Sequence, residues 1–463
     1  MKKKLLVILG AGSSSPLGLP SVKCLDRLMA QWGIEWANRF GTTDHLEELW
    51  QSGEMYYERA PTGPRPVLNF EKVLGDMVAM AHWMEAPPWG NTLMQAACDG
   101  VPPPRMTFRH QSLPDTVEEV TGNPVNSLGD EGDGTTESGD EEVAPSEGLT
   151  GKYGAYIELM DEYSFLLGKL ARHMRAESEK PGSANTTAKD KYRNLLAGLR
   201  KRFDVGVYNL NYDTAALDAL PGAYTGFGET GSFEPSIVHE RRAWHFVYHL
   251  HGSVHHSLNC RYIGDEIVWR RSLDGEFFDD PEGQWTDKRS EGRPFPRTTL
   301  VAGGFKLDQL LVEPFQSFHA SLVRQVYSAD AILIGGYGFG DAHVNWALRN
   351  RFGGTAARPS VPVMLLALAD DRTDPMAFRN DLWAIEVCRT LGANGHSFVE
   401  PDHSSPPVPA DLARRSAFEV DTHHRVAIWH GGFIEAERRV SSIAQWLDGG
   451  ADNALVPDPA RGV

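Results

Sequence analysis

Residues 5–21 read LLVILGAGSSSPLGLPS, and this stretch decides the fold class. Five apolar residues, Leu5–Leu9, are followed directly by Gly10-Ala11-Gly12. A short apolar run that ends at a glycine turn is typical of a strand covered on both faces, as in a parallel sheet. Small residues after such a strand let backbone amides approach a phosphate group. The glycine pattern is incomplete, because Ser15 stands where a third glycine is expected, and a tight strand–helix turn explains it equally well.

Similar apolar runs recur along the chain and alternate with helical patterns. They begin at Val205, Phe246, Ala331, Val361 and Val426. Between them, apolar residues recur every three to four positions, as expected of helices that bury one face. Strands that alternate with helices form parallel sheets with helices on both faces. We therefore predict an α/β fold with a Rossmann-like, doubly wound parallel sheet.

The same patterns predict how the chain is divided. Residues 1–395 are expected to form one domain, with a helical insertion at about 22–200. Residues 111–150 are too polar to pack and are expected to form an acidic, disordered loop. A second long insertion is expected at about 271–297. Residues 396–463 are expected to form a C-terminal extension with a strand and a helix, and the sequence leaves open whether they join the main sheet.

Charge and composition exclude several classes of function. The net charge is −17, and eleven carboxylates lie between Asp115 and Glu147. The remainder of the chain is only mildly acidic, and because binding of a phosphate backbone needs clustered Lys and Arg, we expect no direct binding of nucleic acid. No apolar run approaches the roughly 20 residues that a membrane-spanning helix needs, and the apolar run at the N-terminus is too short for a signal peptide. We expect no membrane association and a cytoplasmic location.

The four cysteines, Cys24, Cys98, Cys260 and Cys388, are scattered and form no Cys-x-x-Cys pair. This spacing argues against a disulfide framework and against a zinc ribbon, which needs ligands in close pairs. We therefore predict no zinc and no other metal site.

Three polar motifs follow the later apolar runs. Residues 209–213 read NLNYD, residues 249–253 read HLHGS, and residues 334–345 read IGGYGFGDAHVN. Each has an ordinary structural explanation: a polar turn, a buried histidine pair, and a glycine loop with Asp341 as helix cap. Ligands of parallel sheets, however, bind at the carboxyl ends of the strands, which is where these motifs lie.

Together, the order of the motifs resembles the sirtuin (silent information regulator) family. The late segment 335–345 and the Asn69-Phe70-Glu71 element resemble the bacterial sirtuin-like domains of anti-phage defence systems. The resemblance spans about residues 4–370 and implies that residues 1–395 form a catalytic domain that binds NAD+.

The resemblance also implies residue roles. The first glycine turn would contact the diphosphate and the nearby ribose, and the late glycine segment would lie near the adenosine or ribose. In the motif at residues 209–213, the second asparagine and the aspartate would handle the nicotinamide ribose and the attacking water. The catalytic residues so implied are His251, Asn211 and Asp213. The NAD-binding residues so implied are Gly10, Ala11, Gly12, Ser13, Gly335, Gly336, Gly338 and Asp341. His249 is expected to be a neighbour of the site rather than part of it.

Departures from the family decide which activity we expect. Sirtuins that deacetylate proteins carry two Cys-x-x-Cys pairs after the His-Gly motif, whereas only Cys260 and Cys388 follow His251 here, 128 residues apart. No convincing Phe-Gly-Glu segment is present to pair with a peptide. What remains is a site that holds NAD+ and offers water as the acceptor, which predicts an NAD+ glycohydrolase. Such an enzyme resembles defence effectors that deplete NAD+.

Unregulated cleavage of NAD+ is toxic, so the resemblance implies control by assembly. We expect a homo-oligomer and a second protein, such as a HerA-type ATPase, a short Argonaute or a nucleotide-sensing subunit. The alternatives are a non-catalytic scaffold that binds NAD+ or ADP-ribose, and a protein deacetylase or ADP-ribosyltransferase. An NAD-dependent dehydrogenase is disfavoured, because no acidic residue is convincingly placed at the end of a second strand.

Overall fold

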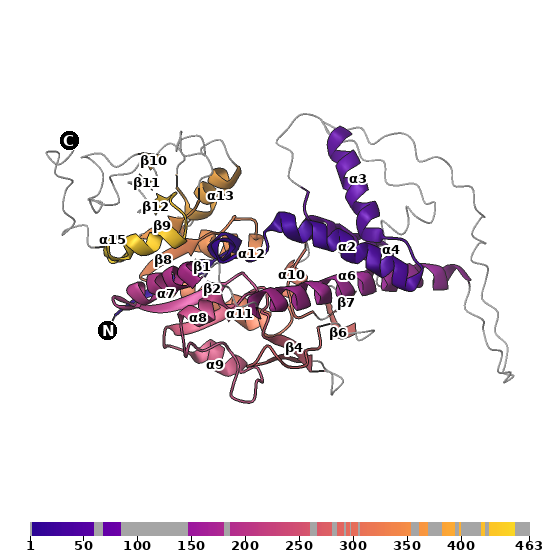
Figure 1. The fold of residues 1–463 in the computed structure, drawn as a ribbon, viewed down its shortest axis with the longest axis horizontal. Helices are drawn as coiled ribbons and strands as arrows, with labels where there is room; N and C mark the ends of the chain where they lie inside the picture. The colour runs from indigo at the N-terminus through magenta and orange to yellow at the C-terminus, as the bar shows by residue number, and fades with distance from the viewer. Residues whose placement is uncertain are drawn as a thin grey trace, which may run out of the picture.

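The computed structural model of the chain is shown in Figure 1. It describes residues 2–59, 68–84, 147–179, 186–259, 266–279, 285–290, 293–296, 298–303, 306–352, 361–368, 382–393, 398–399, 418–421 and 426–449. No helix within these ranges is long and apolar enough to cross a membrane.

The fold is built on an eight-stranded sheet with the order β10-β11-β12-β9-β8-β1-β2-β3. Its parallel strands are β1 (Lys3–Leu9), β2 (Phe203–Asn209), β3 (His245–His249), β8 (Ala331–Gly335), β9 (Val363–Leu366) and β12 (Val426–Trp429). Two antiparallel strands, β11 (Phe418–Asp421) and β10 (Phe398–Val399), extend one edge. Because β12 pairs with β9, the C-terminal extension shares the sheet of the residues before it.

The central position of β1 explains its composition. Side chains of Leu5–Leu9 are fully buried, because neighbouring strands flank β1 on both edges and helices cover both faces of the sheet. The register places Leu9 beside Asn209 of β2 and Gly335 of β8, and Asn209 beside His249 of β3. The strands therefore end in line, and the polar motifs that follow them meet at one edge.

Helices cover both faces of the sheet, as predicted. One face packs against α9 (Pro235–Glu240), α11 (Phe315–Ser328), α12 (Ala342–Phe352) and α13 (Leu382–Leu391). The other packs against η1 (Ser15–Leu17), α7 (Thr186–Arg200), α8 (Ala215–Ala219), η3 (Ile434–Arg439) and α15 (Val440–Leu447). The short α1 (Ala11–Ser14) follows β1 directly. Two apolar cores on opposite faces confirm the doubly wound α/β fold.

The remaining long helices form a separate bundle beside the sheet (Figure 1). They are α2 (Val22–Phe40), α3 (His45–Arg59), α4 (Phe70–Met84) and α6 (Glu147–Glu179). Their apolar core also includes Tyr212 and Leu300, which come from loops at the carboxyl edge of the sheet. The bundle is thus packed against the edge where the polar motifs meet. The last helix of the predicted insertion, α7, does not join this bundle and packs against the sheet.

Two predicted irregular segments are partly ordered. Residues 147–150 of the predicted acidic loop form the start of α6, which corrects that end of the loop, while residues 111–146 lie outside the described residues. The predicted second insertion contains the hairpin of β6 (Trp285–Ser290) and β7 (Arg293–Pro296). Another hairpin joins β4 (His256–Asn259) and β5 (Glu266–Trp269), and the short α10 (Lys306–Gln309) precedes α11.

The loops after β1 and β8 are pressed together, which requires glycine. Gly336 has a φ of +60°, and a Cβ atom there would lie 2.1 Å from the Ser13 nitrogen and 2.3 Å from the Gly12 carbonyl carbon. The Gly12 amide donates a hydrogen bond of 2.9 Å to the Gly336 carbonyl. Side chains are excluded from this contact by both space and backbone conformation.

We predict that Gly336→Ala lowers the free energy of unfolding by about 3 kcal/mol or more, because the added methyl group must push two loop backbones apart. Gly338→Ala is the matched control, since no atom lies within 4 Å of a Cβ there. Thermal unfolding of both variants measures the difference. Equal midpoints for the two variants would show that the loops separate without cost.

Candidate functional site

A cavity of about 540 Å³ opens at the carboxyl ends of β1, β2, β3 and β8. Its walls come from the loops after these strands, from α2 and α4 of the helical bundle, and from α10. Of the predicted site residues, those that line it are Gly10, Ala11, Asn211, Asp213, His251, Gly338 and Asp341. The structure therefore brings together three catalytic candidates and four of the predicted NAD-binding residues.

The other predicted NAD-binding residues lie behind the cavity wall. Gly12, Ser13 and Gly336 form the contact between the two glycine loops, and a Cβ atom at Gly335 would meet the Phe433 ring at 2.5 Å. These contacts fit the structural explanation of the glycine segments, in which small residues allow tight turns after the strands. Their predicted contact with NAD+ stays a prediction.

Asn211 joins the loop after β2 to the loop after β1. Its side-chain nitrogen donates to the Gly10 carbonyl at 3.0 Å and to the Ser14 hydroxyl at 2.8 Å, with the Ser13 hydroxyl 3.2 Å away. These contacts fix the plane of the amide. The side-chain oxygen accepts no hydrogen bond from the described residues, so it is available to a water molecule or a hydroxyl group in the cavity.

Asp213 is buried where this loop enters α8. Its carboxylate accepts a hydrogen bond of 2.8 Å from the Ala215 amide, which is the turn geometry expected of an aspartate before a helix. Burial raises the pKa of Asp213, and hydrogen bonds from Ser14 and Ala215 oppose this effect. The residue thus has a structural role as well as a place in the cavity wall.

His251 lies at the floor of the cavity in a pair with His343. Its Nε2 atom is 2.9 Å from the His343 Nε2 atom, and its backbone carbonyl accepts from the Val301 amide at 2.8 Å. Burial lowers the pKa of His251 well below its usual range, and burial lowers the pKa of His343 to about 4. Both rings are therefore neutral at pH 7.

Two neutral imidazoles in contact must divide the roles of donor and acceptor. His343 was only part of a longer motif in the sequence, which gave no sign of this pairing.

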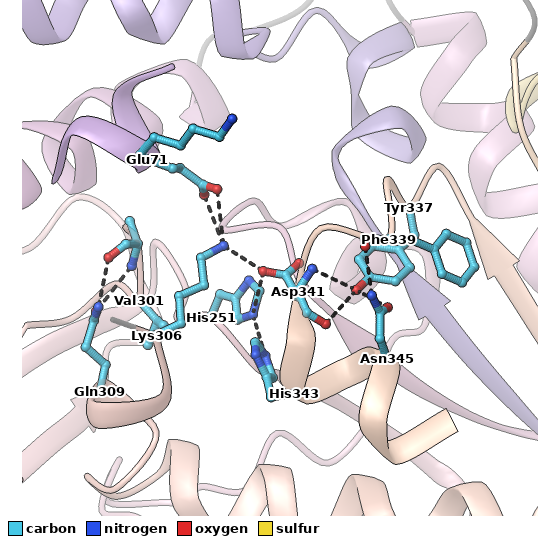
Figure 2. Close-up of polar contacts among 12 residues, drawn as sticks. Glu71, His251, Val301, Lys306, Gln309, Tyr337, Phe339, Asp341, His343 and Asn345 are labelled. Atoms are coloured by element: carbon cyan, nitrogen blue, oxygen red, sulfur yellow. Dashed lines mark hydrogen bonds and ion pairs between the residues drawn. The ribbon is translucent and has the colours of Figure 1, made fainter. Parts of the chain in front are cut away.

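A partly buried charge cluster lies on one side of the cavity (Figure 2). The Lys306 ammonium lies 2.7 Å from Asp341 Oδ1 and 3.2 Å from both carboxylate oxygens of Glu71. Burial lowers the pKa of Lys306, but Glu71 and Asp341 outweigh it and raise the pKa. Conversely, burial raises the pKa of Asp341, whereas His251 and Lys306 lower it to a net value below its usual range. Lys306 and Asp341 are therefore both charged at pH 7.

This cluster links three separate parts of the chain. Glu71 lies in the first turn of α4, where Asn69 caps the helix through a 3.1 Å bond to the Lys72 amide. Lys306 begins α10, and Asp341 directly precedes α12. The predicted Asn69-Phe70-Glu71 element therefore reaches the site, whereas Lys306 carried no motif that could have identified it.

Side-chain bonds within the loop after β8 hold Asp341 in place. Asn345 donates to the Phe339 carbonyl at 2.7 Å and accepts from the Tyr337 hydroxyl at 2.9 Å (Figure 2). The Asp341 amide donates to the Tyr337 hydroxyl at 3.2 Å. Asn345 of α12 thus fixes the conformation of the loop, and the Asp341 carboxylate of the loop pairs with Lys306.

The geometry also allows a cation to be considered. Ligand atoms of His251, Asp341 and His343 lie within 4.8 Å of one another, close enough to hold one metal ion. However, the Lys306 ammonium already neutralises Asp341, and a divalent cation would be repelled by it. Cys24 on α2 and Cys388 on α13 form no disulfide among the described residues, and Cys98 and Cys260 lie outside those residues. The absence of zinc stays a prediction.

His249 differs from His251 although the two are only two residues apart. It belongs to β3 itself, is buried, and does not line the cavity. Its Nδ1 atom lies 3.3 Å from the Asn211 carbonyl, and burial lowers its pKa to about 3. The structure thus places His249 behind the site, as its predicted role as a neighbour requires.

Comparison with known proteins agrees with this arrangement. Residues 205–386 match the family described as the SIR2-like domain. The matched range includes Asn211, Asp213, His251 and Asp341, and it ends before the last strands of the sheet. No curated protein matches the chain. From the family match and from a parallel sheet with these polar loops at its carboxyl edge, we conclude that the chain contains a sirtuin-like domain.

Proposed function

We propose that the chain is an NAD+ glycohydrolase, which cleaves NAD+ to ADP-ribose and nicotinamide. The observation that carries the proposal is the pair of His251 and Asn211 in one cavity: a neutral imidazole that contacts His343, and an amide whose oxygen accepts no hydrogen bond from the described residues. The SIR2-like match supports a function with NAD+, since that superfamily uses it.

The loop after β1 offers a place for the diphosphate. The amides of Gly10, Gly12 and Ser13 are engaged within the protein, in bonds to the carbonyls of Gly335, Gly336 and Gly10, and the Ser15 amide donates to the Ala11 carbonyl. The residues of the loop that line the cavity are Gly10, Ala11, Ser14 and Ser15. Backbone amides and hydroxyls suit phosphate oxygens, and small residues let the ligand approach. We therefore assign the diphosphate to these residues more than to Gly12 and Ser13.

The chemistry requires the ribose to be held while nicotinamide leaves. Departure of nicotinamide places positive charge on the sugar, and a water molecule then attacks. The Asn211 oxygen can orient that water or a ribose hydroxyl, and His251 can accept the proton, an effect worth roughly 10²–10⁴-fold in rate. Asp341 and Asp213 lie in the same cavity wall and favour positive charge there when ionised.

His251→Ala and Asn211→Ala are each predicted to abolish release of nicotinamide, because one removes the base and the other removes the group that orients the water. His249→Ala is the matched control and should keep most of the activity, since His249 does not line the cavity. Chromatography of nicotinamide and ADP-ribose after incubation with NAD+ measures all three.

Thermal unfolding of each variant checks that the fold is intact. An inactive His249→Ala beside an active His251→Ala would refute the site assignment. Binding of NAD+ without any product from the wild-type chain would favour the alternative of a non-catalytic scaffold, and activity on an acetylated peptide would favour a deacetylase.

The rate should respond to pH according to the burial of His251. A base must be neutral to act. Because the pKa of His251 is lowered, its ring stays neutral at pH values well below 6.5, which is the ordinary pKa of histidine. We predict that kcat/KM for NAD+ stays level from pH 8 down to about pH 6 and falls only at lower pH. The pH–rate profile, with fluorescence as a check on folding, tests this. A one-proton fall centred at 6.5 in folded protein would contradict the burial of the base.

The wider role that we propose is an anti-phage defence effector in the cytoplasm, controlled by self-association and by a second protein such as a HerA-type ATPase or a short Argonaute. The motivation is the toxicity of free NAD+ cleavage. Light scattering on the purified chain, followed by co-purification with products of neighbouring genes, measures the assembly. A monomer with full activity and no partner would refute this control.

A further inference from the structure

A second cavity lies at the opposite edge of the sheet, near the amino ends of β1 and β3. Its volume is about 580 Å³, and it is formed by the end of α9, the segment before β3, and α11. Four cationic side chains line it: Lys4, Arg241, Arg242 and Arg324. The only carboxylate among its lining residues is Glu240. No part of the proposed NAD+ reaction uses this cavity.

The positive charge here is not neutralised within the described residues. None of the four cations has a carboxylate oxygen within ion-pair distance there, although the chain as a whole carries a net charge of −17. Beyond the shared wall residue Trp244, the charged residues that line a neighbouring hollow are Lys2, Arg200, Lys201 and Asp204, so its lining is also cationic on balance. Such a concentration of like charge is costly unless an anion joins it.

Two of the guanidinium groups are held in place by backbone carbonyls rather than by acids. Arg241 donates to the His245 carbonyl at 3.2 Å and lies over the Tyr224 ring at 4.5 Å. Arg324 donates to the Val238 carbonyl at 3.0 Å. A guanidinium has five N–H donors, so each keeps several for a ligand. The Arg241 Nε atom is buried and has no hydrogen-bond partner in the protein.

The charges of Arg241 and Arg324 also act on the same side chain, that of Tyr248. Burial raises the pKa of Tyr248, and the charges of Arg241 and Arg324 both oppose this effect. Their fields therefore overlap on the side of the sheet that the cavity adjoins.

We propose that this cavity binds a polyphosphate anion, either inorganic polyphosphate or the phosphate chain of a nucleotide. Fixed guanidinium forks match the oxygens of phosphate groups, and several cations around one cavity suit a ligand with several negative charges. The site is separate from the proposed NAD+ cavity, since it lies at the other end of the same strands, and the proposal does not rest on the NAD+ reaction.

Calorimetric titration of the full chain with inorganic tripolyphosphate tests the proposal. Arg324→Gln and Arg242→Gln should each raise the Kd about tenfold or more, because each removes one charge from the cavity. Arg349→Gln is the matched control, since Arg349 is an arginine of α12 that lies over Trp346, away from this cavity. His251→Ala should leave the Kd unchanged.

A parallel titration with ATP distinguishes the two sources of phosphate: tighter binding than tripolyphosphate supports a nucleotide, and equal binding supports the inorganic anion. The proposal is overturned if tripolyphosphate does not bind in low salt, or if Arg324→Gln and Arg349→Gln bind it equally. It is also overturned if an oligonucleotide at equal phosphate concentration displaces tripolyphosphate, because the surface would then be one for nucleic acid.

Discussion

The contact between the loops after β1 and β8 is the constraint on which the site depends. Gly12 and Gly336 meet backbone to backbone, and only the absence of side chains allows the two loops to approach so closely. This approach turns Ala11 and Ser14 toward the cavity on one side and starts the loop that carries Asp341 on the other. The register of β1 with β2, and that of β2 with β3, then bring the loops after β2 and β3 to the same edge.

The charge cluster around Lys306 adds a second constraint, of a different physical kind. A glycine contact fixes the backbone, whereas the shared ammonium ties Glu71 of the helical bundle to Asp341 of the sheet domain. Removing Lys306 would leave two carboxylates close together with little water to screen them, so the bundle and the loop after β8 depend on it jointly. The helical bundle is therefore part of the site and more than a peripheral insertion.

Sequence alone predicted the features that are local in the chain. The apolar runs identified the parallel strands, and the motifs after them identified Asn211 and His251 at the cavity, because strand ends in a parallel sheet share one edge. Contacts between distant residues could not be predicted. Lys306 meets a carboxylate 235 positions away, and His343 meets a histidine 92 positions away. Of the arginines that line the second cavity, Arg241 and Arg242 are adjacent in the sequence, but Lys4 and Arg324 come from distant parts of the chain, so their meeting at one cavity could not be predicted.

Burial gives the His251–His343 pair a property that neither residue has in water. An exposed histidine is partly protonated near pH 6.5, and two protonated rings 2.9 Å apart would repel each other. In the cavity floor, burial suppresses protonation of both, so the pair is held by a single neutral hydrogen bond. The nearby Asp341 charge opposes this effect and favours a proton on His251. For the hydrolysis that we propose, such an arrangement would keep His251 neutral before the reaction and stabilise it once it has accepted a proton from water.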